Sequence, residues 1–193
     1  MKKVVLIFCM LFISSLFIAP VSAQTSTFVK GDNVLGVGIG FGGVSIGSSY
    51  FGYTYSSTPY ITGYLERCFF DNIFDEKSSI GIGGMIGYKS RKYVITGSNN
   101  GWKETHLLFG ARGAFHYTFV DKLDTYAGSM IGFRVYSDKY LGSFSTKTTS
   151  SSSGLFTDFF AGARYYFTDS FAGFVELGYG WGSAATIGLS LKF

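Results

Sequence analysis

Apolar and polar side chains alternate along eight segments of the chain, and stretches rich in turn-forming residues separate these segments. Such alternation is typical of β-strands, because successive side chains of a strand point to opposite faces. Most segments have about ten residues, the length that a tilted strand needs to cross a bilayer. The pattern therefore predicts an all-β chain of eight strands. They cover Asn33–Gly43, Pro59–Phe70, Ser79–Lys89, Lys103–Phe119, Leu123–Tyr136, Leu155–Phe167, Phe171–Trp181 and Ala185–Phe193.

The two sets of alternate positions carry different chemistry. One set is apolar, and in the first segment it holds Leu35, Val37 and Ile39, with glycines between them. The other set is mostly glycine with isolated charges. Its charged members are Glu66, Arg112, Arg134, Asp158, Arg164 and Glu176, with Lys192 at the rim. Arg67 departs from the rule, although it lies near a strand end, where its head group can reach water.

Alternation alone does not tell which set faces outward, and a soluble barrel such as a lipocalin would place the apolar set inside. Two features favour the inverse arrangement. Glycine dominates the polar set, and small residues suit the crowded inner wall of a narrow barrel. Aromatic residues also gather near segment ends, as the girdles of membrane barrels do. The sequence therefore predicts an eight-stranded antiparallel up-and-down transmembrane β-barrel whose apolar face lies outside.

The first 23 residues have the three parts of a secretory signal peptide. Met1–Lys3 is positively charged, Val4–Ile18 is apolar, and Val21–Ala23 places small residues before a cleavage site. A transmembrane anchor is the alternative, since the apolar stretch approaches the length of a span, but no charged stop-transfer flank follows. We expect residues 1–23 to be removed and residues 24–193 to form a single barrel domain. Cys68 is then the only cysteine, so no internal disulfide is expected.

Composition excludes several other classes of protein. Only 15% of the residues are charged, against about 25% in an average soluble domain, and the chain has 27 Gly, 21 Phe and 14 Tyr. This composition argues against disorder and against a helical bundle. The formal charge of +4, without a basic cluster, gives no support for nucleic-acid binding.

The gaps between the segments predict an orientation. Gaps after the first, third and fifth segments are long, whereas those after the second, fourth and sixth are short. The long gaps are Val44–Thr58, Ser90–Trp102 and Ser137–Gly154, and the short ones are Asp71–Lys77, Val120–Lys122 and Thr168–Ser170. Outer-membrane barrels have long outside loops and short periplasmic turns, so both termini are expected in the periplasm. Ser143–Ser153, rich in Ser and Thr, is expected to be a solvated loop.

The whole chain after the signal resembles a family of membrane proteins. Its eight alternating segments, long alternate loops and closing Ala-Thr-Ile-Gly-Leu-Ser-Leu-Lys-Phe resemble small outer-membrane barrels of the OmpA/OmpX kind. The runs Asn-Val-Leu-Gly-Val-Gly-Ile-Gly-Phe-Gly and Ile-Gly-Ile-Gly-Gly-Met-Ile-Gly-Tyr resemble the β-barrel outer-membrane proteins of Bacteroidetes. The resemblance implies the outer membrane of a Gram-negative bacterium as location. It also implies that Phe193, with apolar residues at alternate positions before it, is the signal read by the barrel-assembly machinery; an ordinary closing strand is the alternative.

An eight-stranded barrel is just wide enough for side chains to fill, so the six inward charges are expected to form a paired plug. A selectivity or gating set is the alternative. If the hairpin around residue 146 is symmetric, Arg134 faces Asp158, and Glu176 and Arg164 form a second pair. His116 is expected to be a further member of the network. Cys68 is interpreted as a small buried filler.

Catalytic chemistry has little support in the sequence. His106 lies near the outer end of its strand, but no Ser-His-acid spacing singles out a nucleophile, so no catalytic residue is assigned. No metal-ligand spacing and no phosphate loop are present in the sequence, and the glycine runs are strand alternation. We therefore expect no cofactor and no metal, and no enzyme activity.

Three function classes are compatible with the sequence. The first is a monomeric structural or surface-interaction barrel, in contact with outer-membrane lipid and with an unidentified ligand of its extracellular loops. The second is a narrow porin-like channel for small solutes. The third is an outer-membrane lipid-modifying enzyme.

Overall fold

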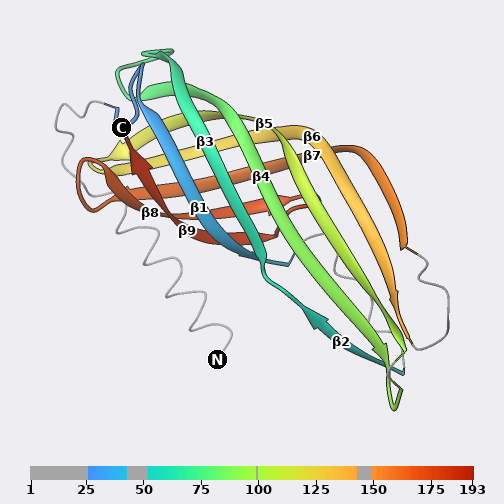
Figure 1. Cartoon of the computed structure of the whole chain (residues 1–193). Coiled ribbons are helices and arrows are strands. Elements are labelled where there is room, and N and C mark those ends of the chain that lie inside the picture. The colour runs from blue at the N-terminus through green and yellow to red at the C-terminus, as the bar shows by residue number, and fades with distance from the viewer. Residues whose placement is uncertain (1–25, 43–51, 99, 143–148) are drawn as a thin grey trace, which may run out of the picture.

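Antiparallel strands form most of the described chain, which comprises residues 26–42, 52–98, 100–142 and 149–193 of the computed structural model. Nine strands lie in these ranges (Figure 1). They are β1 (Asn33–Phe41), β2 (Tyr53–Ser57), β3 (Tyr60–Asp71), β4 (Ser78–Ile95), β5 (Gly101–Val120), β6 (Leu123–Leu141), β7 (Thr149–Tyr166), β8 (Phe171–Tyr179) and β9 (Ala185–Lys192). The expected signal peptide, residues 1–23, lies outside the described residues.

Eight of these strands close into a ring. The order is β1-β3-β4-β5-β6-β7-β8-β9, and β9 pairs with β1 from Phe41↔Ala185 to Val34↔Lys192. All neighbours are antiparallel. β2 stands outside the ring and continues the line of β3 by pairing with the far end of β4 (Figure 1). The structure thus confirms the predicted all-β, eight-stranded antiparallel up-and-down barrel.

Four strands are longer than the alternation predicts, which corrects the expected long loops. β4 runs to Ile95, β5 begins at Gly101, β6 runs to Leu141 and β7 begins at Thr149. β2 likewise lies inside an expected loop, and residues 149–153 of the expected Ser-rich loop are strand. These extensions carry polar side chains on both faces, so they lack the apolar period. Backbone pairing with neighbouring strands holds them in the sheet instead.

The two faces of the barrel wall are inverted relative to a soluble protein. Apolar side chains of the outward set are exposed, including Leu177 at 69%, Ile131 at 59% and Val37 at 58%. The charged side chains of the inward set are mostly buried, and Arg67 lies outside among the exposed residues. The structure therefore confirms that the apolar set lies outside. Within the described ranges, no helix has both the length and the apolar character needed to span a bilayer.

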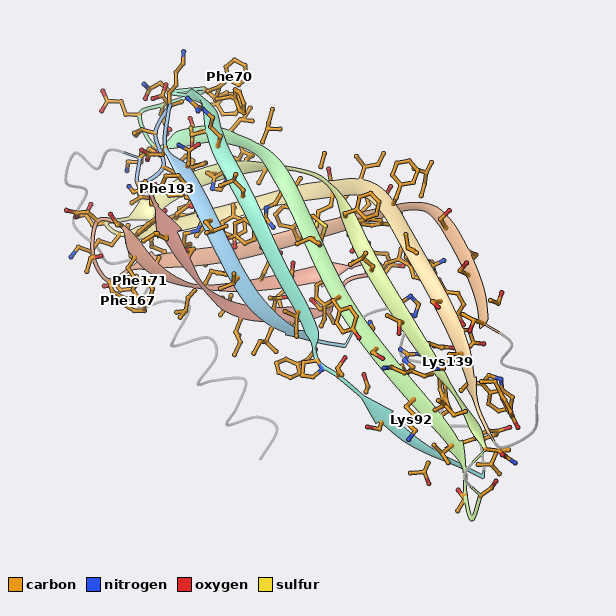
Figure 2. The ribbon with its side chains drawn as sticks, viewed as in Figure 1. Phe70, Lys92, Lys139, Phe167, Phe171 and Phe193 are labelled. Atoms are coloured by element: carbon orange, nitrogen blue, oxygen red, sulfur yellow. The ribbon has the colours of Figure 1, made fainter. Side chains whose placement is uncertain are left out.

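Both ends of the described chain lie at the end of the barrel that carries the short turns. The N–H of Asn33 donates to the carbonyl of Phe193, and Ser26 N–H donates to the carbonyl of Glu76 in the β3–β4 turn. Exposed aromatic side chains crowd this end of the wall, as Figure 2 shows for Phe70, Phe167, Phe171 and Phe193. We call it the short-turn end and the opposite one the outer end.

Neighbouring glycines of β4 show why the inward face tolerates so little bulk. Gly83 faces inward opposite Glu66, and a Cβ placed on it would overlap the carbonyl oxygen of Leu65 and lie 2.7 Å from Cα of Glu66. Gly84 points outward, and the only heavy atom near its Cβ would be the carbonyl oxygen of Gly110, at 3.7 Å. Backbone atoms cannot move aside as a flexible side chain can, so the inward position requires glycine.

We predict that Gly83→Ala destabilises the barrel by about 1–3 kcal/mol, the usual cost of forcing extra volume into a packed site. Gly84→Ala is the matched control and should change the free energy of unfolding by less than about 0.5 kcal/mol. Urea unfolding of both variants in detergent micelles measures the difference. Equal losses in the two variants would contradict the packing described for the inner wall.

Candidate functional site

Six ionisable side chains meet in the middle of the lumen, and all are buried. Five are 2% exposed or less, and the sixth, Glu176, is 9% exposed. We call this set the lumen network. It consists of Glu66 of β3, Arg112 and His116 of β5, Asp124 of β6, Arg164 of β7 and Glu176 of β8. Five different strands contribute, and each side chain points inward because it occupies the glycine-rich set of its strand.

The two guanidinium groups connect carboxylates from different strands. Nε of Arg112 lies 3.3 Å from Oε2 of Glu66, and its Nη2 lies 3.1 Å from Oε2 of Glu176. Nη1 of Arg164 lies 2.9 Å from Oδ2 of Asp124, and its Nη2 lies 3.8 Å from Oε2 of Glu66. Because a buried charge without a partner is costly, these bridges hold opposite walls of the barrel together.

His116 completes the charge balance of the network. Its Nε2 lies 2.8 Å from Oε1 of Glu66, and its Nδ1 lies 3.0 Å from Oδ1 of Asp124. An ionised carboxylate only accepts hydrogen bonds, so both ring nitrogens must donate, which is the imidazolium form. Two guanidiniums and one imidazolium then balance three carboxylates.

Aromatic side chains fill the space around these charges. The guanidinium of Arg112 lies 4.1 Å from the ring centres of both Tyr64 and Phe160, close enough for cation–π attraction. The Tyr126 hydroxyl donates to Oε2 of Glu176 at 3.1 Å, and Nη2 of Arg164 donates to the Tyr64 hydroxyl at 3.2 Å. The lumen is therefore packed at this level by rings and ion pairs.

The segment before β1 closes the short-turn end of the lumen. Phe28 is fully buried, and its ring centre lies 4.6 Å from that of His116. Thr27 hydrogen-bonds to Thr118 through its backbone N–H at 3.0 Å, and the Lys192 ammonium donates to the Thr27 carbonyl at 2.8 Å. Phe28 thus packs against the lumen network from the short-turn end and fills that end of the lumen with an apolar side chain.

The short connection between β8 and β9 folds over the outer end of the lumen. Asp158 accepts hydrogen bonds from the backbone N–H groups of Trp181 at 2.6 Å and Gly182 at 2.8 Å. The guanidinium of Arg134 lies 3.7 Å from the Trp181 ring centre. Gly180 begins this turn at φ +147°, and a Cβ there would overlap the Asp158 carboxylate. Asp158 and Arg134 therefore hold the β8–β9 connection, residues 180–184, in place rather than join the lumen network. We call this connection the cap.

Little free volume remains between the lumen network and this cap. A cavity of about 20 Å³ lies there, lined by residues that include Tyr60, Met130 and Glu176. This volume holds about one water molecule. Above Tyr60, an open pocket of about 320 Å³ is lined in part by Lys89 and Arg91 and faces the outer end. Among the described residues, the lumen is thus packed at mid-height, and an open pocket lies toward the outer end.

The structure brings together four of the six predicted lumen charges and corrects their pairing. Glu66, Arg112, Arg164 and Glu176 lie in the lumen network, but Glu176 binds Arg112 rather than Arg164. The predicted pair of Arg134 with Asp158 is wrong. The β6–β7 register places Arg134 opposite Gly154 and Asp158 opposite Met130. The hairpin is therefore centred on residue 144 rather than 146, which moves the two side chains four residues apart.

Sequence reasoning misses Asp124, Phe28 and the surrounding rings of Tyr64, Tyr126 and Phe160. The expected member His116 lies at the centre of the site. Asp124 is absent from the predicted charges, although it shares the inward set of its strand with Tyr126. That parity is a signal that could have found it. Phe28 precedes the first alternating segment, so no strand pattern marks it as a core residue.

Cys68 and His106 are both buried. Cys68 is 1% exposed, and its thiol donates to the carbonyls of Phe70 at 3.5 Å and Phe28 at 3.8 Å. His106 is buried beside Glu104, with 3.9 Å between Nε2 and Oε2. In residues 26–42, 52–98, 100–142 and 149–193, no three His, Cys, Asp or Glu side chains are arranged to hold a metal ion.

A second polar cluster lies on the inner face of the strand extensions, above the last apolar positions. Hydroxyls of Tyr93 and Tyr136 donate to the two carboxylate oxygens of Glu104, at 3.0 and 3.3 Å. Asp138 lies directly opposite Glu104 on the next strand. Partial burial, with a further contribution from the Glu104 carboxylate, raises the pKa of Asp138 above its ordinary value.

Comparisons with known proteins find likeness in shape alone. No family model matches the chain, and no curated protein matches it. Among solved structures, one similar protein is the attachment invasion locus protein Ail of Yersinia pestis, determined in complex with the heparin analogue sucrose octasulfate. Its sequence is 10% identical to this chain, and the TM-score is 0.48. The alignment covers 86% of this chain and 100% of that chain. The N-terminal β-barrel domain of Pseudomonas aeruginosa OprF is 14% identical, with 85% and 98% covered and a TM-score of 0.46. The outer membrane protein OprG of P. aeruginosa is 12% identical, with 88% and 99% covered and a TM-score of 0.49.

We predict that Arg164→Met costs about 3–5 kcal/mol of folding stability, because it leaves the Asp124 carboxylate buried without its nearest cation. Arg67→Met is the matched control and should change stability by less than about 1 kcal/mol, since Arg67 is exposed on the outer face. Urea unfolding in micelles gives both values.

Adding Asp124→Leu to Arg164→Met makes a double-mutant cycle. Because the two side chains are in direct contact, the double variant should lose clearly less than the sum of the single losses. Additive losses would show that the bridge does not couple the walls.

Proposed function

We propose that the protein is an integral outer-membrane β-barrel whose plugged lumen makes it a structural scaffold, and that it acts through surface interactions at its outer end. The observation that carries this proposal is the combination of an exposed apolar wall with a buried and charge-balanced interior. A soluble protein would lose stability by exposing such a wall to water. A bilayer removes that cost, because lipid tails are apolar.

The dimensions of the exposed wall suit a membrane. The outward set of β8 is apolar from Phe171 to Tyr179, a strand of nine residues. Nine residues extend roughly 30 Å, which gives a height of roughly 23 Å at a tilt near 40°. The apolar band of outer-membrane barrels is about 25 Å tall and is flanked by aromatic girdles. The exposed Phe residues at the short-turn end correspond to one such girdle.

The proposed orientation places the short-turn end and both termini in the periplasm. Outer-membrane barrels have short periplasmic turns and longer external connections. Here the long strand extensions and β2 all lie at the opposite end (Figure 1). The polar inner face of these extensions is therefore the surface offered to the medium and to a ligand of the external loops.

The packed lumen favours a scaffold over the porin-like channel. Solute flow would have to pass Phe28, the lumen network and the cap held by Asp158.

We predict that the refolded protein inserts into lipid vesicles and migrates differently in a denaturing gel with and without boiling. We also predict that it gives no stepwise conductance in planar bilayers. Release from the vesicles by alkaline washing would contradict the membrane proposal. Regular conductance steps would instead support the channel.

Phe193, which directly follows the closing strand β9, is proposed to act in assembly. Its side chain is 64% exposed, whereas its backbone pairs with Asn33. We predict that deleting Phe193 slows barrel assembly in cells at least about tenfold while refolding into detergent changes little. Pulse-chase appearance of the unboiled form measures the first, and in vitro folding rates measure the second. Equal slowing of both would show that Phe193 serves only in closure.

A further inference from the structure

Three lysines lie directly opposite one another on neighbouring strands near the outer end. The register pairs Lys92 of β4 with Lys103 of β5, and Lys103 with Lys139 of β6. Ser56 of β2 and Thr149 of β7 continue the same row on either side. All five side chains are exposed. Figure 2 shows Lys92 and Lys139 far from the phenylalanines of the short-turn end. We call Lys92, Lys103 and Lys139 the lysine row.

The lysine row concentrates positive charge without an acidic partner. Directly opposed residues of antiparallel strands have Cβ atoms about 5 Å apart, and like charges at that spacing repel. Among the described residues, no carboxylate lies within 4.0 Å of these three ammonium groups. Glu104 and Asp138 are sequence neighbours of Lys103 and Lys139, but they occupy the opposite face of the wall. The backbone register therefore holds three cations together on one outward surface.

The lysine row has a defined height above the apolar wall. Tyr88, Leu107 and Val135 face one another in register as the apolar row nearest the lysines on this side of the wall, and Ser90, Thr105 and Ser137 form a hydroxyl row above it. The lysine row comes next. The lysines lie four positions along their strands from the apolar row, which corresponds to roughly 10 Å along the barrel axis. Headgroups occupy roughly 5–8 Å outside the hydrocarbon core, and lysine side chains can reach down to them.

We propose that the lysine row binds phosphate groups of anionic lipid headgroups in the outer leaflet, an inference that rests on the proposed membrane location. Ammonium groups attract phosphate, and the hydroxyls of Ser56 and Thr149 add hydrogen-bond donors at the edges of the row. A lipid whose chains lie against the apolar row delivers its headgroup to the lysines above it. A free phosphate ion lacks this tether. Phosphorylated lipid is therefore the ligand that fits both the charge and the position of the row.

The test compares lipid binding by three proteins refolded in non-ionic detergent micelles. They are the wild-type mature chain, a row variant (Lys92→Gln, Lys103→Gln, Lys139→Gln) and a control variant (Lys30→Gln, Lys77→Gln, Lys122→Gln). The control removes the same charge at the short-turn end. Native mass spectrometry measures binding of diphosphorylated lipid A, its dephosphorylated form and inorganic phosphate. A basic residue at an anionic membrane surface contributes about 1 kcal/mol, or roughly fivefold.

The row variant should bind lipid A at least about tenfold more weakly than wild type, while the control stays within about twofold. All three proteins should bind dephosphorylated lipid equally, and inorganic phosphate should compete poorly. Unchanged binding by the row variant, or an equal loss in the control, would overturn the proposal. Equal competition by inorganic phosphate would overturn the assignment to lipid. Retention in vesicles is measured separately, so failure of the membrane location and failure of the row give different results.

A stability measurement with one variant provides an independent check. In phosphatidylcholine vesicles, Lys103→Gln should raise the urea midpoint, because it removes the central repulsion of the row. In vesicles that contain lipid A, the same variant should lower the midpoint, because it removes a phosphate contact. A shift of the same sign in both membranes would contradict the proposal.

Discussion

The pairing of β1 with β9 is the constraint on which the rest of the structure depends. It turns an antiparallel sheet into a ring, and a ring has an inside and an outside. Every strand must then send alternate side chains to two very different surroundings. The outward set accumulates Leu, Ile, Val and Phe, whereas the inward set must fit a narrow lumen. Glycine recurs in that set and leaves room for aromatic rings such as Tyr64 and Phe160 and for a few charged side chains.

These polar side chains are stable inside the ring only because their charges balance. Arg112 and Arg164 each contact two carboxylates, and His116 bridges two of the same groups. Hydrogen bonds and ring contacts from Tyr64 and Tyr126 satisfy further polar atoms and leave little room for water. Phe28 and the β8–β9 cap close the two ends. The same packing that stabilises the barrel thus makes a solute path unfavourable.

Parity along the strands predicts the ring and the side that each charge faces, but it cannot predict the partners. Partner choice depends on hairpin register. The β6–β7 register is centred on residue 144 instead of the expected residue 146, so Arg134 stacks on Trp181 instead of pairing with Asp158. Phe28 lies before the first strand, where no period marks a core position. The extensions of β4–β7 resemble loops in the sequence because polar residues such as Lys92 and Tyr93 stand on both faces. Backbone hydrogen bonds hold these extensions in the sheet, and the pattern of apolar residues cannot predict such bonds.

The central claim is that the apolar set of the wall contacts lipid while the inward set does not. Neighbouring residues of β8 offer a direct test, because Val175 is 55% exposed and Phe174 is 4% exposed. In a background with Trp102 and Trp181 replaced by Phe, single tryptophans would be introduced as Val175→Trp and Phe174→Trp. Lipids brominated at mid-chain should quench fluorescence strongly in Val175→Trp and weakly in Phe174→Trp. Stronger quenching in Phe174→Trp, or no quenching in either variant, would contradict an inverted barrel in the membrane.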